Sequence, residues 1–165
     1  MTDQQATAAL TAAFPEIVTS EYQGQTRAIV PSAALKAVLE HLKLREGFDF
    51  LVDITCVDYL NYRHAEHRFG LVYLLASTET NRRITLRVFL DERHLVVPSA
   101  VPLWEGANWL EREVWDMFGI RFEGHPDLRR ILLPEEFAAF PLRKDYPLQG
   151  RGERHNFPVL SRSTS

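Results

Sequence analysis

The clearest pattern of apolar and polar positions lies within residues 31–47. Four apolar residues there recur at i, i+3, i+4 and i+7 and therefore share one face of a helix. They are Leu35, Val38, Leu39 and Leu42. Pro31 or Ser32 can begin such a helix and Gly47 can end it. We predict an amphipathic helix here, packed on a core.

Other segments favour extended backbone because they are rich in β-branched and aromatic residues. Residues 16–30 predict two strands that turn at Gly24, and three more strands are predicted over residues 50–60, 67–77 and 83–90. In the last strand every second residue is aliphatic, which is typical of a strand with one buried face. A short Ala-rich helix over the first 14 residues, ended by Pro15, precedes them all.

This order of elements lacks the strict strand–helix alternation of a doubly wound parallel sheet. We therefore expect a two-layer α+β domain over residues 1–142, with a mixed or mostly antiparallel sheet and helices on one face. Seven of the nine prolines lie at or after Pro98, which predicts extended chain around one further helix, residues 108–118. Residues 143–165 hold five basic and two acidic residues and predict an extended arm that orders against a partner.

Composition narrows the class of protein. The 165 residues suit one domain, and 45% hydrophobic and 25% charged residues are ordinary for a soluble globular protein. The net charge of −3 gives no reason to expect nucleic acid as a partner. No apolar run is long enough to cross a bilayer, and the N-terminus resembles neither a signal nor a transit peptide. We expect a soluble, cytoplasmic domain.

Common catalytic and cofactor motifs are absent from the sequence. It holds no Gly-rich phosphate-binding loop, no C-x-x-C, no H-E-x-x-H and no G-x-S-x-G. His64 and His67 fit a polar hairpin tip better than a metal site. Cys56, the single cysteine, fits a core position, and it excludes an internal disulfide. Asp53 and Asp58, which flank it, fit turn or edge roles.

Charged residues concentrate at residues 109–132. On a helix capped by Asn108 and ended at Gly119, four residues form a core-facing stripe. They are Leu110, Val114, Met117 and Phe118. Glu111 and Glu113 then flank the stripe on opposite sides, so they cannot act together as an acid–base pair.

On the far face of this helix, Arg112 and Asp116 stand at i, i+4, a spacing at which they can pair. Trp109 projects to the polar side, where an exposed indole is typical of a protein interface. The following loop adds basic and acidic side chains, but no nucleophile or metal set completes them. They are His125, Asp127, Arg129 and Arg130.

Three interpretations of this segment stay open. The residues favour a surface that binds another protein over a structural salt-bridge network, and both over an active site. The active-site hypothesis would be a free-standing, metal-assisted hydrolase using His125, Asp127 and the two glutamates.

The spacing of these residues also resembles the hallmark of one family. Glu111-Arg112-Glu113, Asp116, Met117-Phe118, His125, Arg129 and Ile131-Leu132 stand at its fixed gaps. The segment "PLRKDYPLQG", residues 141–150, is similar to the family's C-terminal segment. The family is the C-type or 30 kDa subunit of proton-translocating NADH-quinone oxidoreductase, respiratory complex I.

The resemblance implies a non-catalytic subunit of the peripheral arm with no cofactor of its own, FMN and the iron–sulfur clusters lying in partner subunits. It implies packing against the D-type subunit of that complex, which with the B-type subunit forms the quinone pocket. The chain would reach the cytoplasmic side of the bacterial plasma membrane only through partners, as the form not fused to the D-type subunit. It implies that the motif residues act in folding and docking. Related membrane-bound hydrogenases, and complexes that use donors other than NADH, carry the same module.

Overall fold

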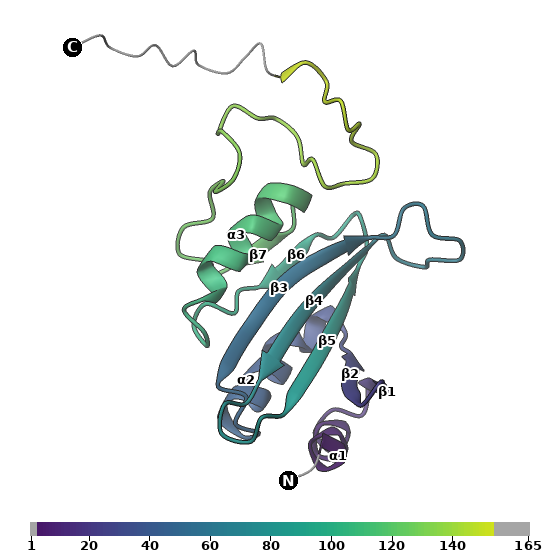
Figure 1. Cartoon of the computed structure of the whole chain (residues 1–165), viewed down its shortest axis with the longest axis vertical. Coiled ribbons are helices and arrows are strands. Elements are labelled where there is room, and N and C mark those ends of the chain that lie inside the picture. The colour runs from purple at the N-terminus through teal and green to yellow at the C-terminus, as the bar shows by residue number, and fades with distance from the viewer. Residues whose placement is uncertain (1–2, 154–165) are drawn as a thin grey trace, which may run out of the picture.

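Residues 3–153 are described in the computed structural model of the protein. They form two β-sheets and three α-helices (Figure 1). The elements are α1 Asp3–Ala13, β1 Val18–Tyr22, β2 Gln25–Ile29, η1 Ser32–Ala34, α2 Leu35–Leu44, β3 Phe50–Asp58, β4 Phe69–Ala76, β5 Arg83–Leu90, β6 Val96–Pro98, α3 Ala107–Phe118 and β7 Arg121–Glu123.

The larger sheet has the strand order β1-β2-β5-β4-β3. Its strands pair antiparallel except for β2 and β5, which run parallel. That one parallel pair arises because η1 and α2 lie between β2 and the rest of the sheet in sequence. The predicted α+β class, with a mixed and mostly antiparallel sheet, is confirmed.

The core lies between one face of this sheet and the helices. Every second residue of β5, from Ile84 to Leu90, is buried, as the alternation predicts. The four apolar residues predicted to share a face of α2 are all buried against that sheet face, with Leu10 of α1 and Val114 of α3 in the same cluster. The helices therefore cover one face, as expected, and in Figure 1 α2 lies behind the sheet.

The short strands β6 and β7 were not predicted. They pair parallel with each other, and each holds only three residues, too few for a period of two to be detected. Their pairing brings the chain before α3 beside the chain after it. Ser99 extends the pairing, because its backbone N–H donates to the Glu123 carbonyl at 2.9 Å.

After β7 the chain continues over α3 without a helix or strand as far as residue 152, in green to yellow in Figure 1. The described residues of this stretch form mainly turns, bends and irregular chain, and the expected extended course stays a prediction. The predicted arm, residues 143–165, is described only as far as residue 153. Its last twelve residues, like the first two of the predicted N-terminal helix, lie outside the described residues.

Candidate docking surface around helix α3

Helix α3 begins one residue earlier than predicted, and Asn108 is not its N-cap. Gly106 occupies the cap position without a side-chain hydrogen bond. The N–H groups of Ala107 and Asn108 are bound instead by the carbonyls of Trp104 and Glu105, at 3.0 and 3.1 Å. A tight turn before the helix therefore supplies what a side-chain cap would otherwise supply.

Gly119 ends α3 as predicted, and the structure gives two reasons for glycine there. Its φ of 78° lies in the left-handed region, which a Cβ disfavours. A Cβ at this position would also lie 2.6 Å from the Phe140 ring and 2.8 Å from the Arg143 guanidinium. A side chain at this position would therefore clash with the chain that passes back over α3. We call this part, residues 124–153, the returning chain.

The buried face of α3 is more polar than the helical wheel indicated. Val114, Met117 and Phe118 are buried as predicted, but Leu110 is only half-buried. Glu111 and Asp116 are fully buried. The sequence prediction assumed that α3 has one contact face. In the structure α3 contacts the sheet on one side and the returning chain on another, so polar residues are buried as well.

Glu111 is bound within the fold rather than presented to a partner. Its carboxylate accepts hydrogen bonds from the Ser99 hydroxyl at 2.7 Å and from the Ala100 backbone N–H at 2.6 Å. Burial raises the pKa of Glu111 to about 7, although these two donors oppose the shift. Glu113 is exposed, so the prediction that the two glutamates point in different directions is confirmed.

Asp116 does not pair with Arg112, and that prediction was wrong. Its Oδ1 accepts a hydrogen bond from Arg130 Nη1 at 2.6 Å. Its Oδ2 accepts three consecutive backbone N–H groups, those of Ile131, Leu132 and Leu133, at 3.0, 2.8 and 3.0 Å. Burial by itself would raise the pKa of Asp116, but the Arg130 and backbone hydrogen bonds outweigh it and lower that pKa.

Arg112 also binds the returning chain. It donates to the backbone carbonyls of Arg129 and Arg130, at 3.2 Å each, and lies 5.1 Å from the Trp109 ring centroid. The predicted i, i+4 pair does not form because both side chains bind the returning chain instead. Arg112 binds two of its backbone carbonyls, and Asp116 binds Arg130 and backbone N–H groups.

The His125 ring closes the turn between β7 and the returning chain. Its Nδ1 accepts the Asp127 backbone N–H at 3.0 Å, so Nε2 carries the proton and donates to the Asn108 carbonyl at 3.2 Å. Arg129 makes an exposed ion pair with Asp127 at 2.8 Å. The ring and the two charges are used in local contacts.

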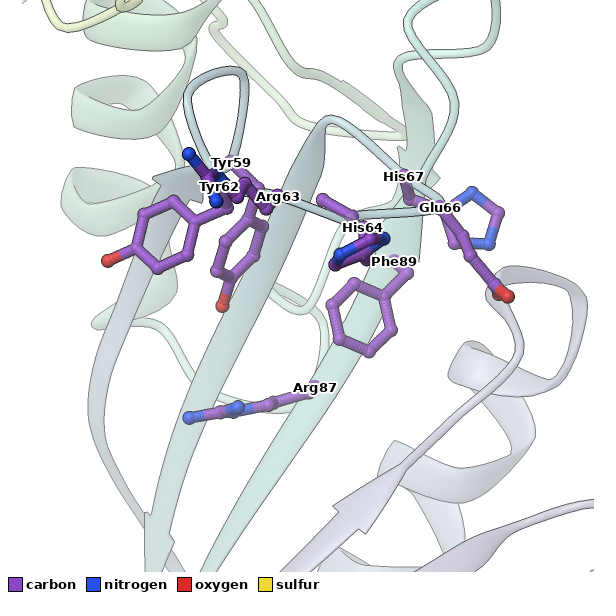
Figure 2. Close-up of a pocket in the computed structure, with 9 residues that line it drawn as sticks. Tyr59, Tyr62, Arg63, His64, Glu66, His67, Arg87 and Phe89 are labelled. Atoms are coloured by element: carbon purple, nitrogen blue, oxygen red, sulfur yellow. The ribbon is translucent and has the colours of Figure 1, made fainter.

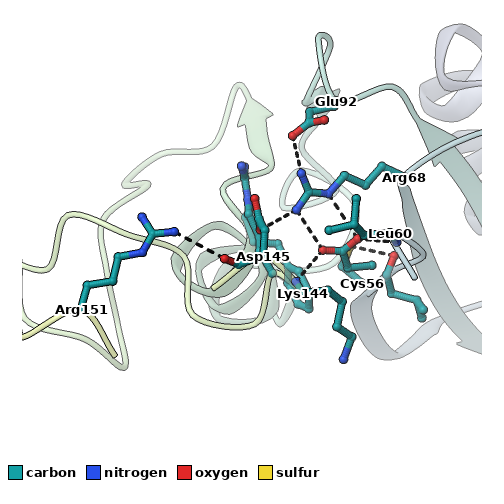
Figure 3. A network of polar contacts seen from close by, with 11 residues as sticks. Cys56, Leu60, Arg68, Glu92, Lys144, Asp145 and Arg151 are labelled. Atoms are coloured by element: carbon teal, nitrogen blue, oxygen red, sulfur yellow. Dashed lines mark hydrogen bonds and ion pairs between the residues drawn. The ribbon is translucent and has the colours of Figure 1, made fainter. Parts of the chain in front are cut away.

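A second polar cluster, which the sequence did not reveal, attaches the next part of the returning chain (Figure 3). Asp58, fully buried at the end of β3, accepts hydrogen bonds from Arg68 and from the Lys144 backbone N–H at 2.8 Å. Arg68 also pairs with Asp145 at 2.6 Å and with Glu92. Asp58 bonds the Leu60 N–H in a turn, as predicted, but its larger role is to join residues 86 positions apart.

Arg143 completes the attachment. Its Nε donates to the Phe118 carbonyl at 2.7 Å, and its guanidinium lies over the Phe69 and Phe140 rings. Two patterns in the sequence point to these residues. Asp58 is a charge in an apolar strand, and Arg143 lies in the segment "PLRKDYP", but neither pattern indicates which residue is the partner.

Apolar side chains are left exposed on α3 and on the chain laid over it. Their exposed fractions are 61% for Trp109, 61% for Leu132 and 49% for Leu142, and Leu148 is fully exposed. Leu148 also lines a groove in the chain laid over α3, together with Leu133, Pro134, Phe137, Pro141 and Tyr146. We call this region, from α3 to residue 148, the α3 surface. Glu113 lies on it, and within residues 3–153 its side chain makes no hydrogen bond or ion pair.

Within the described part of the chain, no three His, Cys, Asp or Glu residues are placed to hold a metal ion. Cys56 is buried on β3, as predicted, and burial raises the pKa of its thiol to about 12, which opposes reaction as a nucleophile. No helix in residues 3–153 has the length and apolar content to span a bilayer.

A small α+β domain whose charged residues fix its own returning chain, and which leaves four large apolar side chains exposed on that chain and on α3, has the features of a subunit in a larger assembly. Residues 28–152 match the family described as respiratory-chain NADH dehydrogenase, 30 kDa subunit, and the chain belongs to that family. The resemblance noted in the sequence is thereby confirmed.

Curated relatives agree. The C-type subunit of the NADH-quinone oxidoreductase of Moorella thermoacetica is 42% identical over 139 residues, covering 84% of this chain and 91% of the relative. The corresponding subunit of Trichlorobacter lovleyi is 51% identical over 116 residues, 70% of each chain.

Solved structures share the fold. A trypsin-resistant fragment of Nqo5 superposes with a TM-score of 0.70 at 36% identity, over 76% of this chain and 98% of that one. A chain of an archaeal membrane-bound sulfane sulfur reductase superposes with a TM-score of 0.77 over 98% of this chain and 95% of that one. At 22% identity the second likeness shows the fold alone.

Proposed function

We propose that this chain is a non-catalytic subunit of a proton-translocating NADH-quinone oxidoreductase and docks through the α3 surface onto the D-type subunit, beside the B-type subunit and the quinone-reducing module. FMN and the iron–sulfur clusters belong to partner subunits in this proposal. The complex lies at the cytoplasmic side of the bacterial plasma membrane, and the chain reaches the membrane through its partners. Family membership supports the complex, and the α3 surface supports the manner of docking.

One observation carries the docking proposal. Leu148 is completely exposed, yet the chain on either side of it is held in place, by Arg68 at Asp145 and by the bond from the Tyr146 hydroxyl to Glu153 at 2.7 Å. An ordered, exposed leucine beside an apolar groove has the character of an interface contact. Burying it on assembly is worth about 1.5–3 kcal/mol.

The test replaces Leu148 with aspartate in the host and measures how much of the tagged chain migrates with the large membrane complex. We expect at least about a tenfold weaker association, since 1.4 kcal/mol corresponds to a factor of ten. The matched control is Leu44→Asp at the end of α2, where the leucine is 71% exposed. Equal loss in both variants, or loss in neither, would contradict docking through the α3 surface.

The electron donor is a separate question, because the same fold occurs in the sulfane sulfur reductase and a fold does not define a reaction. The purified assembly answers it: NADH-dependent quinone reduction supports the proposal. An assembly of the same size that does not oxidise NADH would favour a related hydrogenase or a complex with another donor.

A further inference from the structure

The face of the large sheet opposite the helices is not covered by any described element. In β4 and β5 the residues that alternate with the core, such as Val72, Leu74 and Phe89, lie on it and are only half-buried. Figure 1 shows this face turned toward the viewer with no helix in front of it. We call it the open face.

A pocket of about 400 Å³ lies at the end of the open face where the β3–β4 loop bends over it (Figure 2). Its walls are aromatic, formed by Tyr59, Tyr62 and Phe89, with the His67 ring stacked on Phe89. Gly70 makes this possible, since a Cβ there would lie 2.7 Å from the Tyr59 ring. Tyr59 therefore lies close over β4, and the pocket is built into the sheet.

Arg87 lies at the base of this pocket without an internal partner. Its side chain makes no hydrogen bond or ion pair within residues 3–153, and its Nε is buried with no acceptor. In Figure 2 the Arg87 side chain starts near Phe89 and its guanidinium ends below Tyr59. Arg82 differs in part: its guanidinium donates to the Thr80 hydroxyl and the Glu46 carbonyl, although its Nη1 is also buried without a hydrogen bond. A buried Nε–H without an acceptor carries a free-energy cost, which a ligand carboxylate bound to Arg87 would reduce.

The charge around the pocket selects the chemistry of that ligand. Arg63, His64 and His67 stand at the rim, and Glu66, the acidic residue of the lining, directs its carboxylate away from Arg87 (Figure 2). The aromatic walls suit apolar side chains, and the guanidinium suits one carboxylate held between them.

We propose that the open face is a second docking surface, which receives an acidic, apolar segment of a neighbouring protein subunit whose Asp or Glu carboxylate pairs with Arg87. This inference rests on membership of a multi-subunit complex, but not on docking through the α3 surface. The chain then contacts partners on two sides, and Arg87 is the positioning residue of the second contact.

The first experiment uses the unmodified pocket in the assembled complex. A photo-crosslinking phenylalanine analogue replaces Tyr62, which is 64% exposed at the rim, and the adduct is identified by mass spectrometry after irradiation in the host. We expect one adduct, with a segment of another subunit that contains Asp or Glu beside apolar residues. Adducts only with lipid, with nucleic acid or with this chain itself would overturn the proposal.

The second experiment tests the charge. Arg87→Gln should raise the fraction of the chain that dissociates from the purified complex in rising salt by about tenfold or more, because truncating one partner of a desolvated pair weakens it strongly. Arg45→Gln, an exposed arginine at the end of α2, is the control and should behave as the wild type. Exchanging the charges, with Arg87→Glu and arginine at the crosslinked acid, should restore retention.

The proposals for the two surfaces can be refuted independently of each other. Loss of assembly on Leu148→Asp with unchanged retention on Arg87→Gln keeps the proposed function and overturns the second surface. The reverse result overturns docking through the α3 surface and supports the open face.

Discussion

Replacing Asp116 with asparagine tests whether this buried carboxylate holds the returning chain on α3. The side chain is fully buried and accepts four hydrogen bonds, one from Arg130 and three from consecutive backbone N–H groups. An asparagine amide has one acceptor oxygen. If the amide oxygen faces the backbone N–H groups, the amide NH₂ faces the Arg130 guanidinium, and two donors meet. If the oxygen faces Arg130 instead, the backbone N–H groups have no acceptor.

The expected loss in the free energy of unfolding depends on the hydrogen bonds that Arg130 keeps in the variant. Removing one partner of a buried ion pair costs about 3–5 kcal/mol. Arg130 is 13% exposed and keeps bonds to the carbonyls of Asp116 and Ala139, at 3.1 Å each, so the lower end applies. We expect Asp116→Asn to lower the free energy of unfolding by about 3 kcal/mol, or Tm by about 6–12 °C for a chain of this size.

The assay is urea unfolding of the purified chain followed by tryptophan fluorescence, with the slope of free energy against urea compared between variants. Asp127→Asn is the control, because it removes the same kind of pair from an exposed site, where the two side chains are 50% and 65% exposed. That change should cost about 0–1 kcal/mol.

Acid provides a second readout on the same variant. The pKa of Asp116 is lowered in the folded chain, so its contribution is present above the ordinary carboxyl pKa and is lost as the pH falls through the folded value. The difference between wild type and Asp116→Asn should therefore shrink below about pH 4. An Asp116→Asn variant no less stable at pH 7 than the Asp127→Asn variant would refute the reasoning.

Two further predictions concern the glutamates of α3. The pKa of Glu111 is raised to about 7, so its ionisation makes the wild-type chain lose stability as the pH rises from about 4.5 toward 7. Glu111→Gln should remove that part of the pH dependence, and chemical denaturation at pH 5 and pH 8 measures it; the same slope in both proteins would count against it. Glu113→Ala should lower the amount of assembled complex and leave NADH oxidation per complex nearly unchanged, whereas Glu79→Ala, exposed at the far turn between β4 and β5, should change neither. Normal assembly with collapsed turnover in Glu113→Ala would contradict a docking role.

Local periodicity was sufficient to predict most of the fold. The amphipathic stripe of α2 and the alternation in β5 each follow from one segment and the face it buries, so neither needs knowledge of a partner. The strands β6 and β7 were missed because their parallel pairing depends on the path of the chain around α3. Their three residues carry no pattern of their own.

The candidate site was predicted in position but not in detail. Periodicity placed Glu111 and Asp116 beside or opposite an apolar stripe, yet both are buried, because Ser99 and the chain after residue 130 close over them. Sequence spacing reports neighbours on one helix. It does not report donors that arrive from 12 or 15 residues away.

The returning chain is held mainly through its backbone. Asp116 and Asp58 accept main-chain N–H groups, and Arg112 and Arg130 donate to main-chain carbonyls of the same stretch. Such anchors recognise the path of the chain and not the identity of its outward side chains. Residues such as Leu132 and Leu142 can therefore change over evolutionary time, in step with a changing partner, while the route that presents them stays fixed.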